Sequence, residues 1–285
     1  MIYEYAANEW TVNVLGDIRA LSDEELLEVA NLLSQKTVVV FPDSYDITPA
    51  EQLRIAETIG TVMKAKDKKR THGIYLHEGV IRVTGKKDDK GEPGLFGHNS
   101  ALDWHANMAS NKSRQPIVWM YGAEHMKGSR TSFINMASVY NSLPEKFKEE
   151  IEDIKCFFGY KAGRYSTTPW FHDHINEENL FDLVMTTEAG ITGLYYPFLQ
   201  VFGMAGKDGK EFKKIDEKLR EYILNDKHAY HHDWVNGQII LSDQWMSIHK
   251  RWQFDRMEER VLHRIAFDYS NLYNVYPNQQ IESER

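Results

Sequence analysis

The order of the local signals constrains this chain most: clear helix starts come first, and short β-rich runs dominate later. Residues Ser22 to Glu25 form a capping-box pattern, and the apolar residues that follow recur at helical spacing. The run Thr37 to Phe41 is short and β-branched, which is typical of a buried strand. Thr48 and Pro49 then open a second predicted helix, with proline at its first position.

Strand-like runs dominate from about residue 80 onward, although one more helix is predicted from Glu145 to about Ile154. The predicted strands are Val80 to Thr84, Ile117 to Tyr121, Gln238 to Leu241 after an Asn-Gly turn, and Arg260 to Phe267. Helices followed by strands favour an α+β or mainly β domain with a helical cover. Because no linker-like composition interrupts the chain, we expect one domain over residues 1–285, with residues 1–60 as the helical cover and first strand.

Charge and cysteine content limit the class of protein. The formal net charge is -8, whereas a general nucleic-acid-binding protein needs a basic surface to neutralise phosphates. A single cysteine, Cys156, excludes a disulfide within the chain and fits a reducing compartment. The sequence shows neither a signal-peptide pattern nor an apolar run of about 18 residues. We therefore expect a cytoplasmic protein with no nucleic-acid or membrane partner.

The segment Trp104-His105-Ala106-Asn107 carries a weak metal-site signal. On a strand, residues i and i+2 point to the same side, so His105 and Asn107 would face one common space. A non-haem iron oxygenase needs two imidazoles and one carboxylate on one face of the metal, with positions left open for substrate and oxygen. Asn107 stands where that carboxylate would be. Taken alone, a single histidine beside a tryptophan is more often a packed or surface residue.

Two arginines near the C-terminus give a second signal. On the predicted strand Arg260 to Phe267, Arg260 and Arg264 share a face with Leu262. Two arginines in one cavity are costly unless anions meet them there, and a guanidinium suits a carboxylate bidentately. The alternative is that both lie on the solvated face of an edge strand, and this segment alone does not decide between the two.

Four landmarks together resemble the taurine dioxygenase family of iron(II)/2-oxoglutarate oxygenases. The segment from Trp104 to Asn107 resembles the family's Trp-His-x-Asp motif, and residues 128–143 resemble its Gly-Gly-Asp-Thr block and the Ala-Tyr-x-x-Leu helix that follows. Ser242-Asp243-Gln244 and His249 resemble its Trp-Asp-Asn motif and distal histidine. Arg260 to Ile265 resembles its Arg-x-x-x-Arg strand. The resemblance covers most of the chain and is weakest over about residues 160–229. It implies a mainly β fold with flanking α: a double-stranded β-helix (jelly-roll) core over residues 80–270, N-terminal helices packed outside, and a lid and insert over about residues 160–230.

The resemblance also implies a set of site residues and an activity. The catalytic metal ligands would be His105 and His249, with Asn107 at the third position. The distal carboxylate of 2-oxoglutarate would be held by Thr131 and Arg260, with Arg264 contacting the co-substrate or an anionic group of the substrate. The implied activity is oxidation, most simply hydroxylation, of a small organic substrate with Fe(II), 2-oxoglutarate and O2, releasing succinate and CO2. A homo-oligomer is an open alternative to a monomer.

Asn107 departs from the family pattern and leaves three readings open. Its amide oxygen could bind iron as a neutral ligand. It could instead stand aside and leave a coordination position open, as in the related halogenases. The third reading is a catalytically altered relative, in the extreme a non-enzymatic anion-binding homologue. Asp103 is a less favoured substitute carboxylate, because a loop is expected to end beside it.

The remaining polar candidates are weaker. His98, Asn99 and Tyr75 are candidate substrate contacts, and His77 is similar. The pairs His172/His174 and His231/His232 raise the rival hypothesis of a zinc hydrolase. A structural zinc site needs four convergent ligands, and no cysteine is available to complete one, so we favour the oxygenase.

Overall fold

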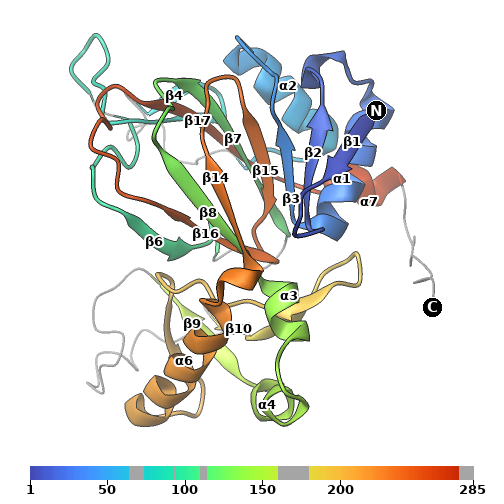
Figure 1. Ribbon diagram of the computed structural model, residues 1–285, viewed down its shortest axis with the longest axis vertical. Helices are drawn as coiled ribbons and strands as arrows, with labels where there is room; N and C mark the ends of the chain where they lie inside the picture. The colour runs from blue at the N-terminus through green and yellow to red at the C-terminus, as the bar shows by residue number, and fades with distance from the viewer. Residues whose placement is uncertain (64–73, 93, 110–113, 160–179, 276–285) are drawn as a thin grey trace.

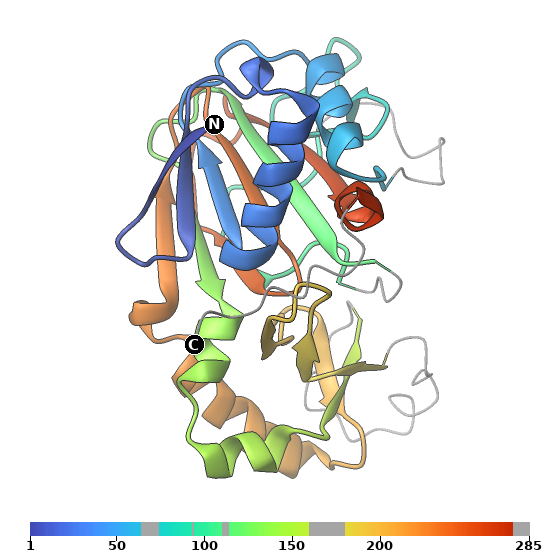
Figure 2. The ribbon, with the colours of Figure 1, turned by 90° about the vertical axis from the view of Figure 1, so that its right-hand side faces the viewer.

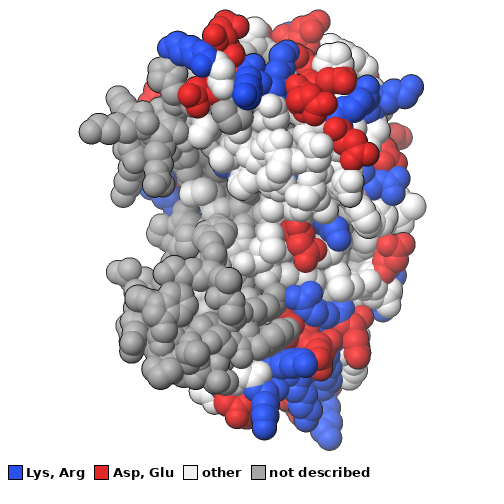
Figure 3. All heavy atoms as spheres, turned by 90° about the vertical axis from the view of Figure 1, so that its left-hand side faces the viewer, with Lys and Arg blue, Asp and Glu red and all other residues white. Residues whose placement is uncertain are grey.

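The computed structural model describes residues 1–63, 74–92, 94–109, 114–159 and 180–275. Figure 1 shows two parts: an upper part with two β-sheets and helices beside them, and a lower part of helices and short strands. None of the helices in the described ranges is long and apolar enough to cross a membrane. On the face in Figure 3, acidic and basic side chains of the described residues lie intermixed around an uncharged area.

The upper part is built from an eight-stranded sheet and a four-stranded sheet. The large sheet has the order β1 (Ile2–Tyr5), β2 (Thr11–Leu15), β3 (Val38–Phe41), β15 (Ile239–Asp243), β7 (Pro116–Glu124), β17 (Val261–Asp268), β5 (Val80–Val83) and β4 (Tyr75–His77). The small sheet has the order β14 (Ala229–Asp233), β8 (Arg130–Asn135), β16 (Ser247–Arg251) and β6 (Leu102–His105). All pairs are antiparallel except β2 with β3.

The N-terminal helices cover the outer face of the large sheet, as Figure 2 shows for α1 (Asp23–Lys36). The predicted capping boxes are present at the starts of α1 and α2 (Pro49–Ile59), with Ser22 and Thr48 as the capping residues. Alternate strand residues of the sheet, such as Trp119, pack with both helices in one apolar cluster. Two further short helices lie near this layer, η1 (Ile18–Ala20) and α7 (Ser270–Val275). The expectation of helices packed outside a β core is confirmed.

The inner face of the large sheet packs against the small sheet. A second cluster joins Val118, Met120 and Leu262 of the large sheet to Phe133 of the small sheet and to Trp234. Large-sheet residues thus alternate between the helix side and the inter-sheet side, as the period of two requires. The space between the sheets therefore receives every second side chain of β7 and β17.

The lower part is an insert between β8 and β14, two strands that pair directly in the small sheet. Its elements are α3 (Met136–Asn141), α4 (Glu145–Ile151), β9 (Lys155–Phe158), β10 (Leu180–Asp182), β11 (Val184–Thr186), β12 (Thr192–Leu194), β13 (Val201–Met204), α6 (Gly209–Ile223) and η4 (Asp226–His228). They enclose an apolar cluster of their own, which includes Val139 and Leu219. The insert begins at residue 136, earlier than expected, because α3 follows β8 directly and packs into this cluster. Residues 160–179, which carry the predicted lid, lie outside the described residues.

Candidate active site

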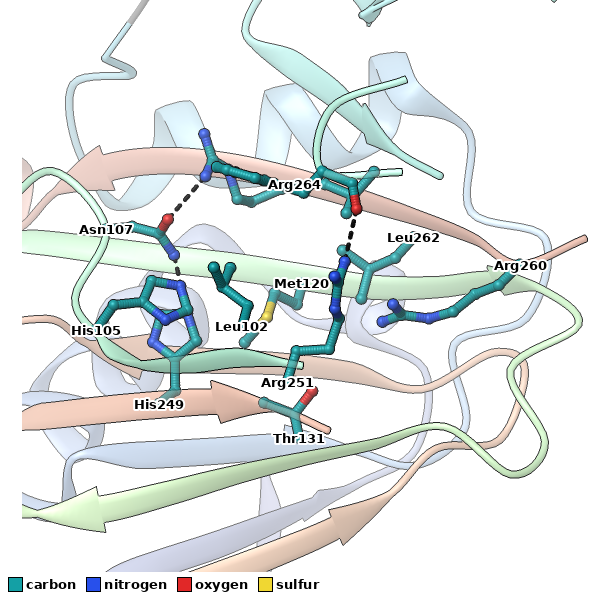
Figure 4. A pocket seen from close by; sticks show the side chains of 12 residues that line it. Leu102, His105, Asn107, Met120, Thr131, His249, Arg251, Arg260, Leu262 and Arg264 are labelled. Atoms are coloured by element: carbon teal, nitrogen blue, oxygen red, sulfur yellow. Dashed lines mark hydrogen bonds between the residues drawn. The ribbon is translucent and has the colours of Figure 1, made fainter. Parts of the chain in front are cut away.

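A cavity between the two sheets collects the predicted site residues (Figure 4). The small sheet contributes side chains from β6, β8 and β16, and the large sheet contributes side chains from β5, β7 and β17. The cavity is lined by Val83, Phe96, Leu102, His105, Asn107, Met120, Thr131, His249, Arg251, Arg260, Leu262 and Arg264. The described lining residues thus include three arginines and two histidines but no aspartate or glutamate. The solvated-face alternative for Arg260 and Arg264 is excluded, because both line this cavity.

Strand register brings the two histidines together although they lie far apart in the sequence. His249 on β16 is directly opposite His105 on β6, and their ring centroids are 4.1 Å apart. His105 Nδ1 lies 2.7 Å from the backbone oxygen of Asp103. Because a carbonyl oxygen only accepts hydrogen bonds, Nδ1 carries the proton and Nε2 keeps a free lone pair. Such a backbone hydrogen bond is the usual means of orienting a metal-binding imidazole.

Burial keeps both imidazoles neutral. Burial, with the nearby Arg264 and Arg251 charges acting in the same direction, lowers the pKa of His105 to about 4. Burial also lowers the pKa of His249 well below its ordinary value, with His105 and Arg264 acting in the same direction. A metal binds the neutral imidazole, so both rings are in the ligating form at neutral pH.

Asn107 is held between an arginine and a histidine. Its Oδ1 accepts a hydrogen bond from Arg264 Nη1 at 2.7 Å, and its Nδ2 lies 3.1 Å from His249 Nε2 (Figure 4). An arginine only donates, so the amide oxygen faces Arg264 and the amide nitrogen faces the histidines. The Asn107 backbone N–H donates to Gln244 Oε1 at 2.8 Å, which fixes the chain at this point. In this orientation the amide turns an N–H, not an oxygen, toward the histidine pair.

Thr131 and Arg260 line the other end of the cavity. The indole N–H of Trp234 donates to Thr131 Oγ1 at 2.9 Å. Because that bond uses the oxygen as an acceptor, the hydroxyl proton of Thr131 is available to a ligand. Arg260 is 2 % exposed, and burial lowers its pKa to about 9, with the charge of Arg251 as the second cause. A guanidinium so deeply buried is a strong anion site.

Arg251 is a site residue that the sequence reasoning missed. It follows His249 at the i+2 position of β16, so its side chain enters the same cavity. The same alternation rule that placed His105 and Asn107 together would have identified it. Trp234, which orients Thr131, was also missed, since it lies beyond the end of β14 and carries no motif.

The weaker candidates do not line the cavity. His98 and Asn99 lie in the loop before β6, where Asn99 Nδ2 donates to the backbone oxygen of Asp255 at 3.3 Å. Tyr75 lies on β4 and is near enough for the Arg264 charge to act on its pKa. Exposed His77 is on the same strand. The substrate roles of these residues stay predictions.

Asp103 and the pair His231/His232 do not form a metal site. Asp103 is exposed and lies 3.6 Å from Lys250 Nζ, so it is turned away from the cavity. His231 contacts Ser132 and Asp226, whereas its neighbour His232 contacts Tyr230 and Gln238. The described residues contain no cluster of three metal-ligating His, Cys, Asp or Glu side chains. The pair His172/His174 lies outside the described residues.

The chain matches a family model described as "Taurine catabolism dioxygenase TauD, TfdA family" over residues 6–266. The chain belongs to the TauD/TfdA family. Pentalenolactone F synthase of Streptomyces avermitilis is 21 % identical over 86 % of each chain. The alpha-ketoglutarate-dependent 2,4-dichlorophenoxyacetate dioxygenase of a Burkholderia species is 22 % identical, also over 86 % of each. The family predicted from the four landmarks is confirmed, and with it the dioxygenase class.

Solved structures confirm the fold. AAD-2 in complex with Mn(II) and N-oxalylglycine superposes with a TM-score of 0.76 at 23 % identity, covering 94 % of this chain and 97 % of that one. A taurine dioxygenase from Burkholderia xenovorans gives a TM-score of 0.70 at 15 % identity, covering 91 % and 87 %. The expected jelly-roll core with flanking helices is therefore correct.

The side chains present fit two of the three protein-ligand positions that an iron site of this kind needs. His105 and His249 offer two neutral imidazoles that line the same cavity with ring centroids 4.1 Å apart, and a two-histidine, one-carboxylate site needs two such ligands. The third corner is occupied by the Asn107 amide, whose oxygen is engaged by Arg264. The cavity also fits a dicarboxylate, because the buried Nε atoms of Arg251 and Arg260 have no hydrogen-bond partner among the described residues.

Proposed function

We propose that this protein is an iron(II)/2-oxoglutarate-dependent oxygenase that oxidises, most simply by hydroxylation, a small organic substrate. One observation carries the proposal: two buried arginines, Arg251 and Arg260, share one cavity with two neutral histidines, and the described lining residues include no carboxylate. Buried cations need anions, and the free lone pair of a buried neutral imidazole needs a hydrogen-bond donor or a metal ion. A dicarboxylate co-substrate and a metal ion together meet both needs.

The co-substrate would lie along the cavity from Arg260 to the histidines. Arg260 would form an ion pair with its distal carboxylate, and Thr131 would donate its hydroxyl proton to the same group. Arg264, near the histidine end, would face either the other carboxylate or an anionic group of the substrate. Apolar walls from Val83, Met120 and Leu262 would exclude water and strengthen these ion pairs.

His105 and His249 would hold the iron. Iron(II) bound there would activate O2, the oxidant, which would oxidise both 2-oxoglutarate, to succinate and CO2, and the substrate. The backbone hydrogen bond from His105 fixes the tautomer of its ring, and Asn107 Nδ2 donates to His249 Nε2, the ring nitrogen that would bind the iron. Strand pairing between β6 and β16 fixes the spacing of the two rings.

The orientation of Asn107 favours a second candidate within the same class. Because its oxygen is bonded to Arg264, the third coordination position is left without a protein oxygen. An open position could take an exogenous anion such as a halide, as in the related halogenases. Dependence of product formation on chloride would favour that candidate, whereas the same product with and without chloride favours hydroxylation.

The named relatives guide the choice of substrates. Two relatives are named for the oxidation of 2,4-dichlorophenoxyacetate or phenoxypropionate, both aryloxy acids. A small organic acid whose carboxylate pairs with Arg264 is therefore the first class to test. We further propose that the protein works in the cytoplasm on a small molecule, without a nucleic-acid or membrane partner, as a monomer or a homo-oligomer.

Succinate formation tests the proposal. The purified protein is supplied with Fe(II), 2-oxoglutarate and O2, with and without a panel of aryloxy and other small organic acids. We expect succinate from the wild type, more of it with a true substrate, and none from His249→Ala. Binding of 2-oxoglutarate with no succinate under any of these conditions would identify a non-enzymatic anion-binding relative instead.

A further inference from the structure

Arg251 is a buried cation whose hydrogen-bond partners among the described residues include no carboxylate. Its side chain is 6 % exposed and crosses the cavity to the loop of residues 95–100 (Figure 4). Nη1 donates to the backbone oxygen of Phe96 at 2.6 Å, and Nη2 donates to those of His98 and Ser100 at 2.9 Å each. Nη2 also lies 3.2 Å from His98 Nδ1. Its Nε is buried and has no hydrogen-bond partner among the described residues. One donor of this guanidinium is therefore left for a ligand.

Arg260 presents a second guanidinium to the same cavity. Among the described residues its side chain makes one weak hydrogen bond, from Nη1 to the Met257 sulfur at 3.6 Å, and its buried Nε has no hydrogen-bond partner there. The charge of Arg251 lowers the pKa of Arg260, so the two cations are close enough to repel each other. Two buried cations with unused donors are costly unless an anion lies between them.

We infer that Arg251 binds the distal carboxylate of the co-substrate together with Arg260 and links that binding to the loop of residues 95–100. The inference rests on the proposed function and adds a residue to it. Strand register supports it, since Arg251 on β16 is directly opposite Thr131 on β8. The carboxylate would thus meet Thr131, Arg251 and Arg260, which lie at one end of the cavity.

Close packing of the loop of residues 95–100 allows its contact with Arg251. A Cβ at Gly97 would lie 2.5 Å from the backbone oxygen of Thr84 and 2.8 Å from Gly85 Cα, so only glycine allows the loop to pack so closely on the end of β5. The packing leaves three carbonyls turned toward one guanidinium, that of Arg251. An anion that fixes this guanidinium also fixes its carbonyl partners. The loop carries His98 and Asn99, the predicted substrate contacts, so co-substrate binding would order a substrate-binding loop.

Calorimetry with the Mn(II)-loaded protein tests the anion contact. We expect Arg251→Met to weaken 2-oxoglutarate binding at least tenfold and Arg251→Lys, which keeps the charge, to weaken it less. Binding of 2-oxobutyrate, which lacks the distal carboxylate, should change less than twofold in both variants. Arg130→Lys is the matched control, because Arg130 on β8 faces outward and pairs with Asp233; it should bind 2-oxoglutarate as the wild type does.

The outcomes separate this inference from the proposed function. If the wild type binds no 2-oxoglutarate, or if Arg260→Met binds it as tightly as the wild type, the proposed function fails. If the wild type binds and Arg260→Met does not, but both folded Arg251 variants bind normally, the inference alone is overturned. An equal loss for 2-oxobutyrate and 2-oxoglutarate would also overturn it, since Arg251 would then act on the fold of the site and not on the distal carboxylate.

Hydrogen exchange tests the link to the loop. In the wild type, 2-oxoglutarate should slow amide exchange in a peptide covering residues 95–101, and Arg251→Met should lose that ligand-induced protection. Unchanged exchange in the wild type on ligand binding would overturn the link. Protection that persists in Arg251→Met would overturn it as well.

Discussion

The guanidinium of Arg264 donates from Nη1 to Oδ1 of Asn107 at 2.7 Å, and this bond sets the chemistry of the third corner of the site. Arg264 comes from the large sheet, whereas Asn107 follows β6 of the small sheet. The contact therefore joins the two sheets across the cavity. Because arginine has no acceptor, it fixes the amide with its nitrogen 3.1 Å from His249 Nε2. A carboxylate in place of the amide could serve both Arg264 and a metal, since it has two acceptor oxygens.

Replacing Asn107 by aspartate should raise the affinity for divalent iron by about tenfold or more. A carboxylate beside a divalent cation adds Coulomb attraction worth about 1.4 kcal/mol or more, even when solvent screens it strongly. Anaerobic calorimetry with Fe(II) measures the effect. Asn107→Leu is the control and should bind iron nearly as the wild type does, because the amide oxygen is engaged elsewhere. A large loss of affinity in Asn107→Leu would show that Asn107 is itself a ligand.

Replacing Arg260 by methionine should stabilise the ligand-free protein while abolishing tight co-substrate binding. Removing a buried cation that lacks an anion is worth about 1–4 kcal/mol of stability when the replacement packs well. The same change removes an ion pair to the distal carboxylate, so 2-oxoglutarate affinity should fall roughly a hundredfold. Thermal unfolding with and without 2-oxoglutarate measures both the change in stability and the loss of binding. The exposed Arg130→Met should show neither, and a lower melting temperature for ligand-free Arg260→Met would contradict the account.

Replacing Trp234 by phenylalanine should weaken 2-oxoglutarate binding by about threefold to tenfold, the worth of one hydrogen bond. The indole N–H donates to Thr131 Oγ1 and so directs the hydroxyl proton toward the cavity. Trp252→Phe is a matched control, because its indole donates at 2.7 Å to Ser132, the next residue of the same strand. Equal effects of the two replacements in a calorimetric titration would show a loss of strand stability and not of Thr131 orientation.

The sequence predicted the parts of the fold that depend on local chemistry. Ser22 and Thr48 indicate where their helices begin, because capping is a local interaction. Strand alternation correctly placed Arg260 and Arg264 on one face. The pairing of β6 with β16 could not be read from the sequence alone, since it depends on the register of distant strands. The orientation of Asn107 was not predictable either. It depends on Arg264 reaching across from the other sheet, which only the assembled sandwich shows.

Stability should fall as the pH is lowered from about 7.5 to about 5. Burial lowers the pKa of His232 and that of His263 to about 4 each. In the unfolded chain the pKa of each histidine is about 6.5, so between about pH 6.5 and pH 4 the unfolded chain binds protons that the folded protein does not bind. The contribution of these histidines to the free energy of unfolding is therefore complete above about pH 6.5. It decreases toward pH 4 by up to about 1.4 kcal/mol per pH unit for each histidine.

Urea unfolding at several pH values measures this dependence. His263→Gln should reduce the slope of stability against pH, because the unfolded variant has one proton fewer to gain. The exposed His77→Gln serves as the control and should keep the wild-type slope. A slope that is unchanged in His263→Gln would show that this histidine is protonated in the folded protein.

The central claim is that His105 and His249 bind iron in the same cavity in which the arginines bind 2-oxoglutarate. Anaerobic addition of Fe(II) and 2-oxoglutarate, followed by visible absorption, tests both halves at once, because a charge-transfer band requires the co-substrate to chelate the metal. We predict a weak visible band in the wild type that is lost in His249→Ala and needs much more 2-oxoglutarate in Arg260→Met. The absence of a band in the wild type, or a band that survives unchanged in His249→Ala, would contradict the account.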